Sequence, residues 1–224
     1  TVLALGTPPP QQDLEAAACQ VGTTPDDIVR LQQILAEPVE DVGFEIIPNL
    51  FLTAIKEGKD LDWLRQKGIT HVVNMCAGEA HIENKMESFT GHKIDRSALW
   101  SKRDCSVRVP ASGRIPEQLL VNAADMPKFD LSPHFNPTVD FITEALAQPD
   151  QRVCVHCGKG VSRSASIVLA YLMKQRGLPL VLAEYAVRLR REQVYPNPGF
   201  MAQLERWQLS GYTEAPNQDG AAQK

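Results

Sequence analysis

The sequence lacks a long hydrophobic run and any excess of basic residues. No apolar stretch approaches the roughly 20 residues that a membrane-spanning helix needs, so we expect no membrane span. The 224 residues carry 23 Lys and Arg against 27 Asp and Glu, which gives a formal net charge of -4. A chain of this charge has no general attraction to nucleic acid or to an anionic membrane, and we expect no nucleic acid partner.

Cysteine is also scarce, and its spacing is not that of a zinc site. The five cysteines are Cys19, Cys76, Cys105, Cys154 and Cys157. The C-x-x-C pair formed by Cys154 and Cys157 has no second pair to complete a structural metal site, so we expect no metal and no cofactor. Free thiols are typical of a reducing compartment, which favours the cytoplasm, with the nucleus as an alternative.

Composition divides the chain into one folded domain with additions at both ends. In order, we expect a disordered tail, a helix with its linker, the folded domain and a second disordered tail, at residues 1–23, 24–41, 42–210 and 211–224. The first tail contains the run Pro8-Pro9-Pro10, which is a poor core-former. Thr24 as a capping residue and Pro25 at the first helical position open the predicted helix.

Short apolar runs alternate with amphipathic stretches through the folded domain. Strands are predicted at residues 44–47, 50–53, 71–75, 119–121 and 152–156. Helices are predicted at residues 61–67, 132–146, 161–176, 180–191 and 198–208. This alternation favours an α/β fold, in which helices cover a central sheet. Residues 77–118 are rich in charged and small polar groups, and we interpret them as an insertion with little regular structure.

The strongest chemical signal is the segment His156-Cys157-Gly158-Lys159-Gly160-Val161-Ser162-Arg163-Ser164. A strand delivers Cys157 to the edge of the sheet, and a helix begins within the next few residues. The two glycines let successive backbone N–H groups point inward as a nest for an anion, beside the positive end of the helix dipole. The same field favours thiolate over thiol. Arg163, six residues after Cys157, can fold back and bind two phosphate oxygens.

This combination predicts phosphoryl transfer to sulfur, with Cys157 as nucleophile and Arg163 as phosphate ligand. The plain alternative is a buried cysteine at a strand end beside a helix. That alternative leaves two glycines, an arginine and two serines within one short segment unexplained.

The leaving oxygen must receive a proton, and an aspartate on a loop opposite the nucleophile can supply it. We favour Asp125, because the strand at residues 119–121 delivers it to the same edge of the sheet. Asp130 is the alternative, although a negative charge just before a helix is also explained by the helix dipole. Spacing alone leaves both open.

These residues resemble the dual-specificity phosphatases, within the cysteine-based phosphatases that share the motif H-C-x-x-G-x-x-R. The resemblance extends from about Val42 to Gln208 and includes four further stretches. They are Ile47-Pro48-Asn49-Leu50-Phe51-Leu52-Thr53, Leu64 with Gly68-Ile69-Thr70-His71-Val72-Val73-Asn74, Asp125-Met126-Pro127 with Asp130-Leu131, and Pro196-Asn197-Pro198-Gly199-Phe200 with Gln203-Leu204. It implies an atypical, compact member with a protein tyrosine phosphatase-like fold, whose mixed sheet is largely parallel and flanked by helices.

The resemblance also implies roles for single residues. Asp125 is the general acid, Ser164 donates a hydrogen bond to the thiolate, and His156 tunes the thiol from behind. Phosphate is bound by the loop residues Gly158, Lys159, Gly160, Val161, Ser162 and Arg163. Lys159 stands where the family usually has a small residue, and it either adds positive charge to the pocket rim or faces solvent.

Cys76 corresponds to a cysteine that some relatives use in a reversible disulfide with the nucleophile. The resemblance therefore makes Cys76 a redox partner of Cys157, and the alternative is a buried structural thiol.

The predicted function is hydrolysis of phosphotyrosine and of phosphoserine or phosphothreonine on protein substrates, through a cysteinyl-phosphate intermediate and without a metal. One alternative keeps the chemistry on a non-protein phosphoester, such as a phosphoinositide, an RNA 5′-phosphate or a phosphoglycan. Another alternative is a phosphate-binding scaffold without catalysis.

Overall fold

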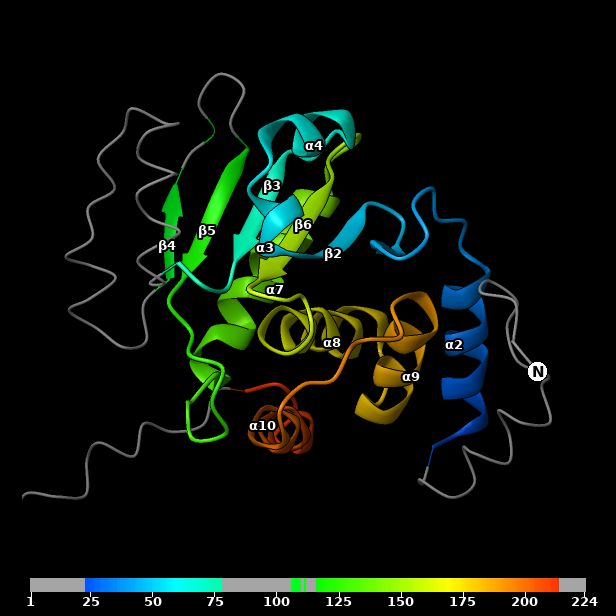
Figure 1. The fold of residues 1–224 in the computed structure, drawn as a ribbon. Helices are drawn as coiled ribbons and strands as arrows, with labels where there is room; N and C mark the ends of the chain where they lie inside the picture. The colour runs from blue at the N-terminus through cyan, green and yellow to red at the C-terminus, as the bar shows by residue number, and fades with distance from the viewer. Residues whose placement is uncertain (1–22, 78–105, 110, 112–115, 214–224) are drawn as a thin grey trace, which may run out of the picture.

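The computed structural model describes residues 23–77, 106–109, 111 and 116–213 (Figure 1). Its strands are β1 Glu45–Ile47, β2 Leu50–Ala54, β3 His71–Asn74, β4 Ser106–Val109, β5 Glu117–Val121 and β6 Val153–Cys157. Its helices are α2 Pro25–Ala36, α3 Ile55–Gly58, α4 Leu61–Gln66, α7 Phe135–Leu146, α8 Arg163–Arg176, α9 Leu180–Arg190 and α10 Pro198–Leu209, with the 3-10 helix η1 Ser132–His134 before α7. All the strands and helices predicted above are present among these elements.

The strands form one mixed sheet in the order β1-β2-β6-β3-β5-β4. The central strands β2, β6, β3 and β5 are parallel to one another, and antiparallel β1 and β4 flank them. The prediction of an α/β fold with a largely parallel sheet is therefore confirmed. A parallel sheet requires cover on both faces, since the crossover helices must pack against it.

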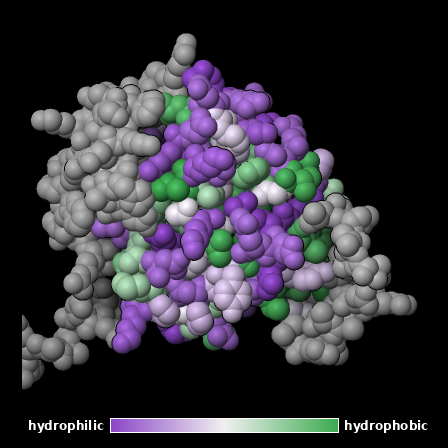
Figure 2. Space-filling model, viewed as in Figure 1, coloured by the Kyte–Doolittle hydropathy of each residue, from purple (hydrophilic) through white to green (hydrophobic). Residues whose placement is uncertain are grey.

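The two faces of the sheet carry two separate hydrophobic clusters. Helices α7, α8, α9 and α10 lie together on one side (Figure 1), and the larger cluster fills the space between them and the sheet. The smaller cluster, which includes Phe51, Leu64 and Val72, lies under α4 on the other face. The described residues on the face shown in Figure 2 are mostly hydrophilic, with hydrophobic side chains in scattered spots.

Helix α2 shows how local sequence fixes an element before tertiary packing does. The Thr24 side chain accepts a hydrogen bond from the Asp27 amide, and the Asp27 carboxylate accepts one from the Thr24 amide, which forms a complete capping box. Pro25 occupies the first turn, as predicted. The apolar residues Leu31 and Ile34 of this helix are buried in the main cluster.

Strand β4 corrects the interpretation of residues 77–118. Little regular structure was predicted there, yet Ser106–Val109 pairs with β5 as the edge strand of the sheet. The strand has only four residues and two valines, so its alternation is too short to mark a strand in the sequence. Residues 78–105, which make up most of the predicted insertion, lie outside the described residues.

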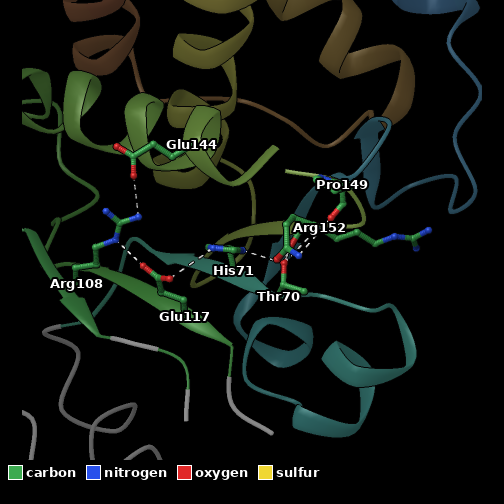
Figure 3. A network of polar contacts seen from close by, with 8 residues as sticks. Thr70, His71, Arg108, Glu117, Glu144, Pro149 and Arg152 are labelled. Atoms are coloured by element: carbon green, nitrogen blue, oxygen red, sulfur yellow. Dashed lines mark hydrogen bonds and ion pairs between the residues drawn. The ribbon is translucent and has the colours of Figure 1, made fainter. Parts of the chain in front are cut away.

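A polar network ties this edge strand to the rest of the domain (Figure 3). Arg108 forms ion pairs with Glu117 of β5 and with Glu144 of α7, and its guanidinium lies over the Phe141 ring. His71, whose pKa is lowered by burial, lies 3.6 Å from Glu117. Because His71 and Glu117 begin their strands, the network lies at the end of the sheet opposite Cys157.

Most predicted boundaries differ from the observed ones by one or two residues, and two of these differences bear on the site and on the limits of the domain. Helix α8 begins at Arg163 rather than Val161, so residues 161 and 162 belong to the preceding loop. At the other end, the described chain continues to Thr213, and Tyr212 packs edge-on against Trp207 with 4.8 Å between ring centroids. The remaining residues expected to be disordered, 1–22 and 214–224, lie outside the described residues.

Candidate functional site

Cys157 is the last residue of β6, at the centre of the sheet. It aligns with Ala54 at the end of β2, and His156 aligns with Asn74 at the end of β3. The carboxyl ends of three parallel strands therefore meet at this edge, which is where open α/β sheets bind their ligands. Residues 158–162 form the loop that joins Cys157 to the start of α8.

The loop curls tightly because Gly160 adopts a conformation that other residues avoid. Its φ is 68°, and a Cβ placed there would lie 2.5 Å from the Thr53 carbonyl oxygen. Arg191, just after α9, donates its Nε–H to the Gly160 carbonyl over 3.3 Å and its Nη1–H to the Gly43 carbonyl over 2.8 Å. The end of β2 and the Arg191 guanidinium thus hold the loop from two sides.

Cys157 is buried, with only 1% of the residue exposed, and its sulfur lies at the floor of this loop. Its Sγ accepts hydrogen bonds from the Gly160 amide at 3.3 Å and from the Ser164 hydroxyl at 3.1 Å. Burial by itself raises the pKa of the Cys157 thiol. The Ser164 hydroxyl and amide oppose it, together with the Arg163 charge and the Gly160 amide, and the net pKa is lowered.

Arg163 folds back over the start of the loop. Its side chain is buried, and Nη1 donates to the Ala123 carbonyl over 3.0 Å. A Cβ placed on Gly158 would lie 3.1 Å from Nη2, so the guanidinium lies directly against the first loop residue. The positive charge is therefore fixed beside the sulfur by backbone contacts.

His156 lies behind the nucleophile as a neutral side chain. It is 1% exposed, and burial, with the charges of Lys59 and Arg163, lowers its pKa to about 3. Gly58 of α3 packs on the ring, since a Cβ there would come 2.3 Å from its Cγ. Any influence of His156 on the thiol thus comes from an uncharged imidazole; the role itself stays a prediction.

Asp125 lies at the mouth of the same loop, in the segment that follows β5. Its Oδ1 accepts hydrogen bonds from the Ser162 hydroxyl at 2.6 Å and from Asn197 Nδ2 at 2.9 Å. Asp130 is occupied elsewhere: its Oδ1 accepts from the Ser132 amide at 3.1 Å and from the Ser132 hydroxyl at 2.6 Å, at the start of η1. The geometry therefore brings Asp125, and not Asp130, to the nucleophile loop.

The remaining predicted loop residues have distinct positions. Lys159 is exposed on the outside of the loop. The Val161 carbonyl accepts a hydrogen bond from the Tyr195 amide at 2.9 Å, which joins the loop to the segment before α10. Ser162 is buried, and its side chain is directed to Asp125 rather than to the centre of the loop.

The two other described cysteines lie on different faces of the sheet. Cys76 belongs to the same hydrophobic cluster as Cys157, and its thiol donates to Asn74 Oδ1 over 3.4 Å. Cys154 belongs to the opposite cluster, where burial raises its pKa to about 12. Successive residues of a strand point to opposite faces, so Cys154 and Cys157, three positions apart, cannot face each other.

Sequence reasoning missed three side chains of this site: Ser162 as a partner of Asp125, Asn197, and Arg191 as a support of the loop. Asn197 stands before Pro198 and is readable as a helix cap, but its contact with a carboxylate 72 positions earlier has no local signal. Among the residues that the structure describes, no group of three acidic, histidine or cysteine side chains could hold a metal ion. Within the same part of the chain, no helix is long and apolar enough to cross a membrane.

Comparisons with known proteins agree with this geometry. The family model described as dual specificity phosphatase, catalytic domain, matches residues 50–210. Dual specificity protein phosphatase 13B of Mus musculus is 41% identical over 161 residues, which are 72% of this chain and 70% of that protein. The crystal structure of human DUSP28 superposes with a TM-score of 0.58 at 26% identity, covering 80% of this chain and 100% of that one. A mouse putative dual specificity phosphatase complexed with zinc tungstate superposes with a TM-score of 0.57 at 26% identity, over 78% of this chain and 92% of that one.

Proposed function

The chain belongs to the dual specificity phosphatase family and is a protein phosphatase; from this premise we propose that Cys157 is its nucleophile and Asp125 its general acid. The observation that carries the proposal is the environment of one sulfur atom. The Cys157 Sγ accepts hydrogen bonds from the Ser164 hydroxyl and the Gly160 amide, beside the buried Arg163 guanidinium. This arrangement stabilises an anion on sulfur and leaves inward-facing amides for a second anion.

In the first step the Cys157 thiolate attacks phosphorus. The S–P bond forms as the P–O bond to the substrate breaks, and Asp125 transfers its proton to the leaving oxygen. Arg163 and the amides of residues 158–163 bind the phosphate oxygens, and their contribution grows as charge spreads over these oxygens. The product of this step is cysteinyl phosphate with an ionised Asp125.

In the second step water attacks the same phosphorus. Asp125 accepts a proton from the water as the O–P bond forms and the P–S bond breaks. The Ser164 hydroxyl stabilises the departing thiolate, and inorganic phosphate leaves. Neither step requires a metal or an organic cofactor.

The phosphate-binding role of the loop has support from a relative. The solved mouse structure is described as a complex with zinc tungstate, and tungstate is a tetrahedral oxyanion like phosphate. We propose that the loop of residues 158–163 binds the phosphoryl group, with exposed Lys159 adding positive charge at the rim.

Phosphorylated proteins are the substrates that the family implies, with phosphotyrosine and phosphoserine or phosphothreonine both accepted. The comparisons do not favour a non-protein phosphoester. A scaffold without catalysis is disfavoured as well, because Cys157, Arg163 and Asp125 are all in place. We further propose residues 42–210 as the catalytic domain and the cytoplasm as the compartment, since the mechanism needs a reduced thiol and none of the described cysteines Cys76, Cys154 and Cys157 forms a disulfide.

Rapid-quench kinetics with an aryl phosphate tests the assignment. Wild type is expected to release one equivalent of phenol in a burst, and mass spectrometry of acid-quenched protein should find phosphate on Cys157. Cys157→Ser should show neither the burst nor the modification. Turnover by Cys157→Ser at the wild-type rate would exclude the proposed nucleophile. A panel of phosphotyrosine, phosphothreonine and lipid phosphate substrates, assayed in parallel, tests the substrate class.

A further inference from the structure

Asp125, Ser162 and Asn197 form a closed ring of hydrogen bonds at the mouth of the site. Asn197 Nδ2 donates to Asp125 Oδ1 over 2.9 Å, and the Ser162 hydroxyl donates to the same oxygen over 2.6 Å. The backbone N–H of Asn197 in turn donates to the Ser162 side-chain oxygen over 3.1 Å. Ser162 belongs to the nucleophile loop and Asn197 precedes α10, so the ring joins three separate parts of the chain.

The directions of these hydrogen bonds are fixed by their surroundings. Asn197 Oδ1 accepts a hydrogen bond from the Phe200 backbone N–H over 3.1 Å and thereby caps α10. The other side-chain atom, Nδ2, must therefore be the one that faces Asp125. The Ser162 oxygen already accepts from the Asn197 backbone, which directs its hydroxyl hydrogen to the carboxylate. Both donors therefore act on one oxygen, Oδ1, and nothing in the ring donates to Oδ2.

The first turns of α10 also hold the backbone of the loop that carries Asp125. Gly199 touches the loop so closely that a Cβ there would lie 2.0 Å from the Pro127 carbonyl oxygen. The buried Gln203 side chain accepts a hydrogen bond from the Leu131 backbone N–H over 2.7 Å and donates one to the Phe129 carbonyl over 2.8 Å. The loop is thus fixed at its beginning, middle and end by one helix.

We propose that Asn197 and Ser162 are positioning residues that select which oxygen of Asp125 carries the catalytic proton. The proposal rests on the proposed role of Asp125 as general acid. In a protonated carboxyl group the carbonyl oxygen accepts hydrogen bonds better than the hydroxyl oxygen does. Because two groups donate to Oδ1 of Asp125, Oδ1 is favoured as the carbonyl oxygen. The proton then resides on Oδ2, which delivers it to the leaving oxygen and accepts one from water in the second step.

If the Asp125 proton is misplaced, kcat/KM should fall by different factors for substrates with different leaving groups. A good leaving group such as dinitrophenolate departs with little help, whereas phenolate needs the proton in the transition state. Loss of the ring is therefore expected to steepen the dependence of log kcat/KM on the pKa of the leaving group. The ratio kcat/KM reports the steps up to departure of the leaving group, so slow hydrolysis of cysteinyl phosphate does not obscure the effect.

Asn197→Ser is the variant that isolates the effect. Serine is a good helix cap, so it keeps the bond to the Phe200 amide, but its side chain is too short to donate to Asp125. We expect kcat/KM for phenyl phosphate to fall about 10- to 100-fold, with a fall of only about threefold for dinitrophenyl phosphate. Asn136→Ser is the matched control, because Asn136 also makes two side-chain hydrogen bonds but contacts Lys174 and the Tyr212 carbonyl. It should leave the leaving-group dependence unchanged.

The double variant Asp125→Asn/Asn197→Ser completes the experiment. If the ring acts through the acid, adding Asn197→Ser to Asp125→Asn changes kcat/KM by less than about twofold. Equal losses across the aryl phosphate series, or losses that multiply in the double variant, overturn the proposal while the acid assignment stands. A wild-type slope in Asp125→Asn itself removes the acid assignment and the proposal together.

Discussion

The Ser164 hydroxyl lies 3.1 Å from the Cys157 sulfur and donates its hydrogen to it, from the first turn of the helix that follows the loop. In the proposed cycle the sulfur is an anion before attack and again when the P–S bond breaks, and this contact stabilises the anion at both points. Its contribution should be largest in the second step, where the thiolate is the leaving group.

Ser164→Ala is expected to lower kcat by roughly 10- to 100-fold, since a hydrogen bond to a charged group is worth about 1.5–3 kcal/mol. It should also raise the pKa of Cys157, because the Ser164 hydroxyl is the group that most lowers this pKa against the effect of burial. The rate of alkylation by iodoacetamide, measured against pH, reports this pKa. Burst kinetics should show cysteinyl phosphate accumulating.

Ser166→Ala is the matched control for this prediction. Ser166 is equally buried in α8, but its hydroxyl donates to the Ser162 carbonyl over 2.9 Å and does not touch sulfur. An alkylation profile that shifts as much in Ser166→Ala as in Ser164→Ala would contradict the assigned role.

The conformation of Gly160 gives a second prediction. Gly160→Ala must accommodate both a left-handed φ and a Cβ that meets the Thr53 carbonyl oxygen at 2.5 Å. We expect a loss of more than about 1–2 kcal/mol in the free energy of unfolding and a loss of phosphatase activity, because the loop must open to relieve the contact. Urea unfolding and aryl phosphate hydrolysis measure the two effects.

Gly211→Ala separates the two causes. Gly211 has the same φ of 68°, but nothing lies within 4 Å of the Cβ it lacks. Gly211→Ala should therefore lose only about 1 kcal/mol in the free energy of unfolding, from the unfavourable backbone conformation alone. It should keep full phosphatase activity. If the two alanine variants lose equal stability, the contact with Thr53 is not the deciding factor.

His156 provides a prediction about pH. Its pKa in the folded chain is about 3, against an ordinary value of 6.5, so the unfolded chain binds a proton more readily. The stabilising contribution is fully present above pH 6.5 and is lost progressively as pH falls toward 3, by up to about 1.4 kcal/mol per pH unit. Urea unfolding of wild type and His156→Gln at pH 7.5 and 5.5 measures it. The wild type should lose about 1 kcal/mol more than the variant between these values; equal losses would contradict a buried neutral imidazole.

The features that could be predicted from the sequence are those that depend on residues close together in the chain. Each strand of the parallel sheet is a short apolar run, and the capping box of α2 is written in four consecutive residues. The loop from Cys157 to Arg163 is also local, since its shape depends on glycines within the motif. These features need no knowledge of distant partners.

The contacts that could not be predicted join residues far apart in the chain. Asn197 reaches Asp125, and Arg191 reaches Gly160 and Gly43, with no periodic signal that links their positions. Strand β4 was missed for a related reason. Its four residues include only two apolar side chains, and Arg108 is tied to the domain by ion pairs with Glu117 and Glu144 that the local sequence does not signal.

The last prediction concerns oxidation. The Cys157 thiolate attacks one oxygen of hydrogen peroxide, which forms a sulfenic acid and releases hydroxide; attack by a neighbouring thiol on the sulfenic sulfur then forms a disulfide and releases water. Cys76 lies in the same hydrophobic cluster, two residues after the end of β3, the strand beside β6, whereas Cys154 lies in the cluster on the opposite face. We therefore expect peptide mapping to find a Cys76–Cys157 link, and activity to return with reductant.

Cys76→Ser and Cys154→Ser form the matched pair for this test. Without Cys76, peroxide should drive Cys157 to the sulfinic acid, and reductant should no longer restore activity. Cys154→Ser should recover like wild type, because a strand cannot turn residues three positions apart to the same face. Sulfinic acid on Cys157 in the wild type, with no link to Cys76, would show that Cys76 is a structural thiol held by Asn74 and that the fold leaves its nucleophile unprotected.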